Sequence, residues 1–268
     1  MPDQDVYEVF ALKYAQRSDR TRNESFVFAD AHDSPHPIDY YIWVARSEDR
    51  LLVIDTGFDP EEAARRDRQL TQRPRDMLAM LDIDAGAVSD VIITHMHYDH
   101  AGSLQDFPAA RFHLQAAEMS YVTGPCMCHD DLSHPFTVDH VLEMVRNVYS
   151  GRVAFAQGDA EIAPNLSVHK LGGHTGGLQC VRVLTRRGWV VLASDGSHFY
   201  ENFERRKLFP IVLDAEAMIR GFERLEALAE SRDHVVPGHD PLVAQRYPAL
   251  DSRFEDRIHR LDVAPADR

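Results

Sequence analysis

The sequence predicts an α/β sandwich in which helices lie outside β-sheets. Strand-like and helix-like segments interleave along the chain, and hairpin-like strand pairs occur near both ends. No repeat, low-complexity tract or flexible linker divides it. The 268 residues are 44% hydrophobic and 27% charged, which is average for a globular protein. Layered folds with β-sheets often reach this length as one unit, so we expect residues 1–268 to form a single domain.

The first half of the chain contains clear strand and helix signals. Tyr40–Val44 and Leu51–Ile54 are apolar and predict two strands joined by a turn over 46–50. Asp59 is a helix N-cap residue, and Pro60 and two glutamates follow it in the positions that favour a first turn. A further helix and a short buried strand are expected at 76–81 and 91–93.

In the second half, strands and helices continue to interleave. Asp214 is expected to cap a long amphipathic helix whose apolar face carries Met218, Phe222, Leu225 and 228–229. The other predicted helices are 116–122 and 139–149, and 126–135 is expected to be a loop. The predicted strands are Phe112–Leu114, Leu166–Leu171, Cys180–Leu184, Trp189–Ala193 and Val235–Val236.

Composition excludes several functional classes. The net charge of −14 repels phosphate backbones, so a nucleic-acid partner is not expected. No apolar run approaches the roughly 20 residues that a membrane span needs. Three cysteines cannot form a disulfide framework, and the first residues lack the basic and apolar features of a secretory signal. We therefore expect a cytoplasmic protein that acts on a small molecule away from membranes.

Four metal-ligand residues lie within six positions directly after a short apolar strand. They are His95, His97, Asp99 and His100, in the stretch Thr-His-Met-His-Tyr-Asp-His. Imidazole and carboxylate groups suit zinc or a similar transition metal. A loop that follows a strand can turn several of these side chains toward one point, so the stretch predicts a metal site.

Three more residues of ligand type occupy the same kind of position. His174, Asp195 and His239 each follow a predicted strand and stand beside glycine. Each alone is weak evidence, since a single histidine is more often structural. Together with the cluster they make seven ligands, more than one tetrahedral ion uses. Seven ligands suit two metal ions about 3.5–4 Å apart that share a carboxylate and a water.

The order His-x-His-x-Asp-His, then His, Asp and His, resembles the metallo-β-lactamase superfamily. Residues 54–57, Ile-Asp-Thr-Gly, also match an early strand of that family, and the resemblance spans about 40–240. It implies an αββα sandwich of two mixed β-sheets with helices on the outside and the site at one edge of the sheets. By this resemblance the first ion would be held by three histidines, the second by Asp99 and two histidines, and Asp195 would bridge them. The ligands are His95, His97 and His174 for the first ion, and Asp99, His100 and His239 for the second.

The resemblance also implies zinc as the cofactor, although iron, manganese or cobalt remain alternatives. Asp55 would orient a ligand histidine, or it is an ordinary turn residue. Attack of a metal-bridging hydroxide on a carbonyl would need no serine or cysteine nucleophile, so the implied enzyme is a hydrolase. Asp99 would be both ligand and proton carrier.

Within the superfamily, the chain looks most like the quorum-quenching N-acyl-homoserine lactone lactonases. The similarity lies in chain length and in Thr94–Gly102, Gly173–Gly177 and Ser194–Phe203. Those enzymes place a tyrosine three residues after the bridging aspartate, where its hydroxyl helps the lactone carbonyl. Here His198 stands at that position and Tyr200 follows two residues later. Either could contact the substrate, and a plain surface role for His198 stays open.

This departure keeps other substrates open, namely a cyclic amide, an aromatic lactone or a thioester. An iron-dependent sulfur dioxygenase uses a subset of the same ligands. A binding protein that retains the scaffold without catalysis is the non-enzyme alternative, against which the complete ligand set argues.

Residues 116–157 are expected to form a helical insertion or lid. Met119, Tyr121, Met127 and Phe136 would line a substrate pocket beneath it. A third metal site is an alternative for five residues of this region, but Cys-x-Cys-His lacks the usual two-residue spacer of a zinc hook. The five are Cys126, Cys128, His129, His134 and His140. The same loop could instead serve contacts within a homodimer.

Overall fold

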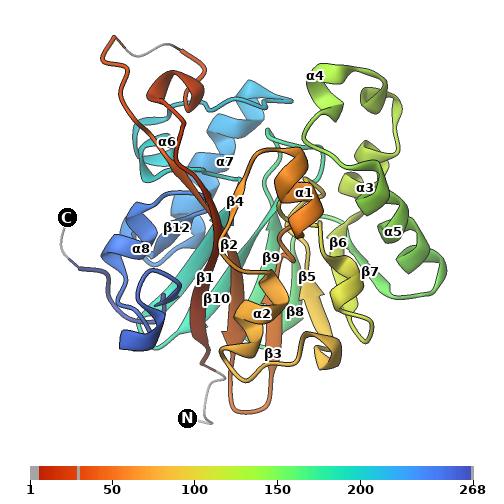
Figure 1. Cartoon of the computed structure of the whole chain (residues 1–268), viewed down its shortest axis with the longest axis vertical. Coiled ribbons are helices and arrows are strands. Elements are labelled where there is room, and N and C mark those ends of the chain that lie inside the picture. The colour runs from red at the N-terminus through yellow and green to blue at the C-terminus, as the bar shows by residue number, and fades with distance from the viewer. Residues whose placement is uncertain (1–5, 29–30, 267–268) are drawn as a thin grey trace.

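The computed structural model describes residues 6–28 and 31–266, and it confirms the sandwich of two mixed β-sheets with helices outside them (Figure 1). The first sheet has the order β13-β1-β2-β3-β5-β6-β7, with β4 paired to β1. Its strands are β1 (Glu8–Arg17), β2 (Ile38–Arg46), β3 (Leu51–Ile54), β4 (Gln69–Leu70), β5 (Asp90–Ile92), β6 (Arg111–Gln115), β7 (Val153–Ala156) and β13 (Ile258–Arg260).

The second sheet has the order β12-β11-β10-β9-β8. Only β11 and β12 are parallel, whereas β8, β9, β10 and β11 pair antiparallel in sequence. Its strands are β8 (Ala160–Ala163), β9 (Leu166–Lys170), β10 (Gln179–Thr185), β11 (Gly188–Ser194) and β12 (Val235–Pro237).

Helices cover the outer faces of the two sheets. The α-helices are α1 (Pro60–Arg65), α2 (Pro74–Ala79), α3 (Ala116–Val122), α4 (Asp130–Ser133), α5 (Val138–Tyr149), α6 (Tyr200–Arg205), α7 (Ala215–Leu228) and α8 (Leu242–Arg246). Short 3-10 turns are η1 (Arg22–Glu24), η2 (Ala85–Ala87), η3 (Leu104–Asp106), η4 (Pro125–Cys128), η5 (Arg232–His234) and η6 (Ser252–Phe254). No helix in the described part of the chain is long and apolar enough to cross a membrane.

Two buried clusters hold the layers together, and β1 contributes to both. Phe10 and Leu12 face the cluster beneath α2, α3 and α5, while Val9 and Ala11 face the cluster that joins the two sheets and reaches α7. Successive side chains of a strand point to opposite faces, so one strand serves both layers. Because both of its faces are buried, β1 lacks the apolar–polar alternation that marks a strand in sequence, and it has no counterpart among the predicted elements.

The predicted helices mostly form where expected. Asp59 and Asp214 cap α1 and α7 by accepting hydrogen bonds from the backbone amides of Glu62 and Ala217. The helix expected at 76–81 begins two residues earlier, since Pro74 occupies its first position. The segment 126–135, expected to be a loop, instead contains η4 and α4.

The expected helical segment 116–157 is the connection between two parallel neighbours of the first sheet. It leaves β6, forms α3, η4, α4 and α5, and returns as β7. Figure 1 shows these helices together on one flank of the sandwich. A parallel pair needs such a long crossover, because a tight turn can join only antiparallel strands.

Candidate metal centre

All seven expected ligands follow strands whose C-terminal ends meet at one edge of the sandwich. The stretch that holds His95–His100 follows β5, which runs parallel to β3 in the first sheet. In the second sheet, β11 and β12 are parallel, and β9 points the same way because both β9 and β11 are antiparallel to β10. His174, Asp195 and His239 follow these strands, so the two sheets deliver their ligands to a common point.

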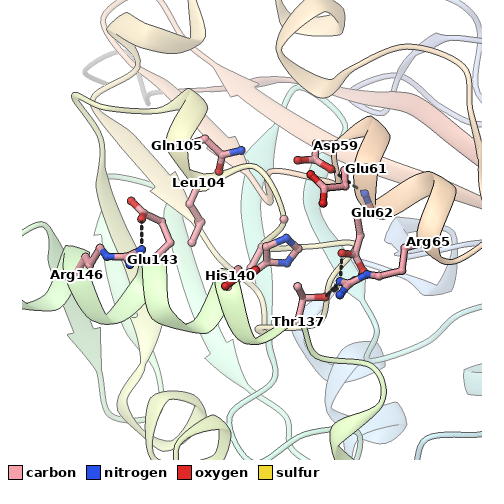
Figure 2. A pocket seen from close by; sticks show the side chains of 13 residues that line it. Asp59, Glu61, Glu62, Arg65, Leu104, Gln105, Thr137, His140, Glu143 and Arg146 are labelled. Atoms are coloured by element: carbon pink, nitrogen blue, oxygen red, sulfur yellow. Dashed lines mark hydrogen bonds and ion pairs between the residues drawn. The ribbon is translucent and has the colours of Figure 1, made fainter.

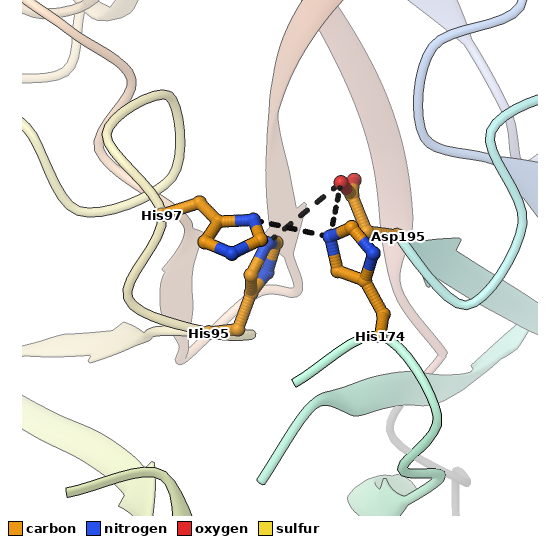
Figure 3. Close-up of side chains that lie close together, drawn as sticks. All are labelled: His95, His97, His174 and Asp195. Carbon is orange, nitrogen blue, oxygen red and sulfur yellow. Dashed lines mark hydrogen bonds and ion pairs between the residues drawn. The ribbon is translucent and has the colours of Figure 1, made fainter. Parts of the chain in front are cut away.

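The first group consists of three histidines and one carboxylate (Figure 3). Nε2 of His95 lies 2.9 Å from Nδ1 of His97, and that atom lies 3.0 Å from Nε2 of His174. Oδ2 of Asp195 is 3.1 Å from Nε2 of His174 and 3.7 Å from Nε2 of His95. Four donor atoms bound at about 2.0–2.2 Å to a tetrahedral ion lie at separations of this size, so the group fits such an ion.

The second group lies on the other side of Asp195. Its Oδ1 atom is 3.1 Å from Nε2 of His100 and 2.9 Å from Nε2 of His239. Oδ2 of Asp99 is 3.6 and 3.7 Å from the same two nitrogens. The two oxygens of the Asp195 carboxylate therefore face different groups of ligands.

The outer nitrogens of three histidines are held by acceptors. Nδ1 of His174 lies 2.9 Å from the carbonyl of Ile211, and Nδ1 of His239 lies 2.8 Å from the carbonyl of Asp39. Nδ1 of His100 lies 2.8 Å from Oδ2 of Asp55. Since a carbonyl only accepts, Nδ1 must carry the proton in His174 and His239, and the lone pair of Nε2 then points inward.

Buried atoms without hydrogen-bond partners show that the group is suited to a metal. Among the described residues, Nε2 of His100 and Oδ1 of Asp195 face each other yet make no hydrogen bond of acceptable geometry. Nearly all buried polar atoms in proteins are paired, so these two call for a group between them. A divalent transition ion binds both atom types, and the residues present therefore fit two such ions.

The electrostatics of the two groups differ. Burial lowers the pKa of His95 and His97 well below the usual range. Burial also opposes the charge on His100, but Asp195, Asp99 and Asp55 outweigh it and raise the pKa of that imidazole well above its usual value. The same carboxylates that favour positive charge on His100 also favour a bound cation at the second group.

Glu118 ties two ligand loops together, and sequence reasoning missed it. Its Oε1 accepts a hydrogen bond from the amide of Met96 at 2.9 Å, between two ligand histidines. Its Oε2 accepts from the hydroxyl of Thr175 at 2.7 Å and from the amide of Gly177 at 2.8 Å. A glutamate in the first turn of a helix carries no sequence signal for this role.

The structure brings His198 to the cluster but not Tyr200. Nε2 of His198 lies 2.9 Å from Oδ2 of Asp195, and burial lowers the pKa of His198 to about 3. Tyr200 is buried away from the ligands, with Arg246 stacked over its ring 4.4 Å from the centroid. The helix α6 begins at Tyr200, which turns its side chain into the core.

A cavity of about 380 Å³ opens over the ligands. None of Met119, Tyr121, Met127 and Phe136 is among its lining residues, although Phe136 packs on the ring of His97 with centroids 4.5 Å apart. The walls come instead from β1, β2, the segment after α1 and the loops at 134–135 and 210–211. Besides ligands they comprise Arg17, Arg20, Glu24, Ile38, Tyr40, Arg66, Arg68, Tyr98, His134, Pro135, His198, Pro210 and Ile211.

A separate cavity of about 370 Å³ lies between α1, η3 and α5 and contains no ligand of the centre (Figure 2). Glu62 lines it, and this carboxylate pairs with Arg65 and Arg66 and accepts a hydrogen bond from Thr137. Arg66 in turn donates to the carbonyl of His134 at 2.9 Å. A third metal site, which the sequence allowed only as an alternative, has no support here, since no ligand group found among the described residues includes Cys126, Cys128 or His129.

Comparisons with known proteins agree with this geometry. The family model described as the metallo-beta-lactamase superfamily matches residues 37–252. A probable metallo-hydrolase of Mycobacterium tuberculosis is 25% identical over 232 residues, which cover 75% of this chain and 71% of the relative. An N-acyl homoserine lactonase of a Bacillus species is 24% identical over 222 residues, covering 76% of this chain and 82% of the relative.

Solved structures show the same fold. The crystal structure of a quorum-quenching N-acyl homoserine lactone lactonase superposes with a TM-score of 0.73 at 19% identity, covering 90% of this chain and 95% of that one. A dizinc quorum-quenching lactonase superposes with a TM-score of 0.66 at 14% identity, covering 89% and 92%. The chain belongs to the metallo-beta-lactamase superfamily and is a metallo-hydrolase whose relatives include N-acyl homoserine lactonases.

Proposed function

We propose that this protein is a dinuclear zinc hydrolase that opens the ring of a lactone, an N-acyl-homoserine lactone or a related compound. The observation that carries the proposal is the position of Asp195, whose two carboxylate oxygens face separate groups of ligands. Lactonases among the sequence relatives support the choice of substrate.

The residues divide into two sets around that carboxylate. His95, His97 and His174 would hold one ion, while Asp99, His100 and His239 would hold the other. Two bound ions supply a water whose pKa lies near 7 and a Lewis acid that polarises a carbonyl oxygen.

Asp99 is suited to move the proton. Its carboxylate belongs to the second ligand group, where it lies 3.6 Å from Nε2 of His100, and it also lines the cavity. Lactone hydrolysis adds the oxygen of water to the carbonyl carbon, breaks the ring C–O bond and leaves a hydroxy acid. In this scheme Asp99 takes a proton from the attacking water and returns it to the ring oxygen as that bond breaks.

His198 is suited to hold Asp195 and to contact the substrate. A neutral imidazole carries one N–H, and with Nε2 donating to Asp195 its Nδ1 is left as an acceptor. It therefore offers the substrate an acceptor where the related lactonases offer a tyrosine hydroxyl. This difference favours a second candidate, hydrolysis of another carbonyl compound such as an aromatic lactone, a cyclic amide or a thioester.

Proton release from zinc-loaded protein tests the proposal. Hydrolysis of a lactone or a thioester releases a proton, which a pH indicator reports on a panel of short and long N-acyl-homoserine lactones, other lactones and thioesters. A cyclic amide gives a carboxylate and an ammonium group without net proton release, so its loss is followed by chromatography. We expect chelator-sensitive acid release on at least one lactone class. The activity of a His198→Tyr variant on the same panel shows how the acceptor nitrogen of His198 affects which substrate is hydrolysed. Hydrolysis of cyclic amides or thioesters alone would favour the second candidate. No hydrolysis of any compound at full metal occupancy would contradict both.

A further inference from the structure

The cavity over the ligands is rich in arginine, although the chain as a whole carries a net charge of −14. Four arginines line it, against one glutamate outside the ligand set. They come from two segments, 17–20 and 66–68, which β4 and β1 bring together by pairing at Ala15–Leu70 and Gln16–Gln69. Outside the ligand set, the charged residues of the wall are therefore mostly positive, as expected for a site that attracts an anion.

Two of the four arginines are already paired with carboxylates. Arg17 contacts Asp19 at 2.9 Å and Glu24 at 3.1 Å. Arg66 pairs with Glu62. The other oxygen of Glu24 accepts a hydrogen bond from the backbone amide of Thr21 at 2.9 Å, so that carboxylate is fully engaged. These ion pairs neutralise the charges of Arg17 and Arg66.

Arg20 and Arg68 are different, because neither forms an ion pair with a carboxylate in the described part of the chain. Arg20 is only 9% exposed, and its Nη1 atom has no hydrogen-bond partner among the described residues. Burial lowers the pKa of Arg20, but an arginine stays charged in proteins. Its Nη2 atom donates to the backbone carbonyl of Glu24. A buried guanidinium without a carboxylate partner is still costly, which indicates a site that an anion completes.

Arg68 is linked to the metal ligands through two tyrosines. Its Nε donates to the hydroxyl of Tyr98 at 3.0 Å, and that hydroxyl lies 3.2 Å from the hydroxyl of Tyr40. Tyr98 stands between the ligands His97 and Asp99 in sequence, and the ring of Tyr40 packs on that of His239 with centroids 5.3 Å apart. One tyrosine layer therefore separates Arg68 from the centre.

We propose that Arg20 and Arg68 form an oxyanion subsite, so that the substrate carries a carboxylate at a short distance from the carbonyl that is attacked. This inference rests on the proposed function, since it names the class of substrate for the same centre. A guanidinium binds a carboxylate with parallel hydrogen bonds, which fixes both position and orientation. The tyrosine hydroxyls would set the spacing between this anchor and the reacting bond.

The experiment compares two lactones of the same ring and nearly the same shape, γ-butyrolactone-γ-carboxylate and its neutral carboxamide. Hydrolysis of the first adds one water and gives 2-hydroxyglutarate. We measure kcat/KM for both with zinc-loaded wild type, Arg20→Gln, Arg68→Gln and the control Arg220→Gln. Arg220 lies on α7, is 73% exposed and pairs with Glu216, so its replacement makes the same charge change far from the cavity.

We expect wild type to prefer the carboxylate, and each cavity variant to reduce that preference by about 10- to 100-fold, the usual effect of losing a hydrogen bond to a charged group. Arg220→Gln should leave it unchanged. The preference is a ratio within each protein, so partial loss of folded enzyme cancels. Equal kcat/KM values for the two lactones in wild type, or an unchanged preference for the carboxylate in both cavity variants, would contradict the oxyanion subsite. Either result would still be consistent with lactone hydrolysis.

A binding measurement separates this inference from the proposed function. If neither lactone is hydrolysed, the lactonase proposal loses this substrate class, and calorimetric titration with 2-hydroxyglutarate still decides the subsite. Binding that weakens at least tenfold in both cavity variants, but not in Arg220→Gln, would support the anion site. Equal binding in all four proteins would contradict it.

Discussion

The carboxylate of Asp55 lies 2.8 Å from Nδ1 of His100, although 45 residues separate them in sequence. Asp55 is fully buried, and it also accepts hydrogen bonds from the amide of Thr94 at 2.7 Å and its hydroxyl at 2.8 Å. Both oxygens are therefore in use, and the contact turns Nε2 of His100 toward Asp195. Asp55 acts on the centre through His100 and contacts no ion itself.

Replacing Asp55 with asparagine should weaken binding at the second group of ligands by about 10- to 100-fold, as expected when the partner of a ligand histidine is lost. The backbone at Asp55 has φ of 63°, a conformation that asparagine also adopts, so the fold should survive. Chelator competition measures the affinity. Asp84→Asn, at the cap of η2, is the control for the charge change. Equal affinities in Asp55→Asn and wild type would refute the role.

His198→Phe should lower kcat for lactone opening by about 10- to 100-fold while both metal ions stay bound, because a hydrogen bond to the bridging carboxylate is lost. The ring of Phe209 packs on His198 with centroids 3.9 Å apart, so an aromatic replacement keeps the packing. Kinetics and metal content are measured on the same preparation. Activity equal to wild type would exclude a direct part for His198.

Gly173→Ala should lower the free energy of unfolding by about 2–4 kcal/mol, because the added Cβ would disturb the loop before His174. Gly173 has φ of 89°, and a Cβ there would lie 2.4 Å from the backbone nitrogen of Met218 in α7. Gly151→Ala is the matched control, because φ is 74° but nothing lies within 4 Å of its Cβ, so it should cost only about 1 kcal/mol. Urea denaturation gives both values, and equal costs would contradict the close approach.

His36 should make the fold sensitive to acid. Burial, followed by Arg22 and Arg20, lowers the pKa of His36 to about 4, below the value near 6.5 of an unfolded chain. The unfolded state therefore takes up the proton first, and the stabilising contribution, complete above pH 6.5, is lost as the pH falls to 4. With allowance for solvent screening, the loss should be about 1 kcal/mol.

The measurement is the free energy of unfolding of wild type and His36→Asn at pH 7 and pH 4. The asparagine cannot titrate, so the variant should lose about 1 kcal/mol less than wild type over this interval. An equal loss in both proteins would show that the acid sensitivity arises elsewhere.

The position of the centre could be predicted from sequence because its ligands are chemically distinctive and stand after recognisable apolar strands. His174 and His239 illustrate this, since each follows a strand and a glycine. Their supporting acceptors could not be predicted. The carbonyls of Ile211 and Asp39 are backbone groups, and every residue in the chain has one.

The substrate cavity was the least predictable part. Met119 and Met127 are near the ligands in sequence but do not line the cavity, whereas Arg20 and Arg68 belong to distant segments that the pairing of β1 with β4 brings together. β4 has two residues, too few to leave a periodic signal. Tyr200 was placed near the carbonyl by its spacing from Asp195, but α6 begins there and directs its side chain into the core.

Native mass spectrometry of the zinc-loaded protein tests whether Asp195 holds two metal ions at once. We expect two zinc ions per chain in wild type and weakened binding of both in Asp195→Ala, whereas His239→Ala should lose mainly one. Only one ion in fully loaded wild type, or two firmly bound ions in Asp195→Ala, would contradict it.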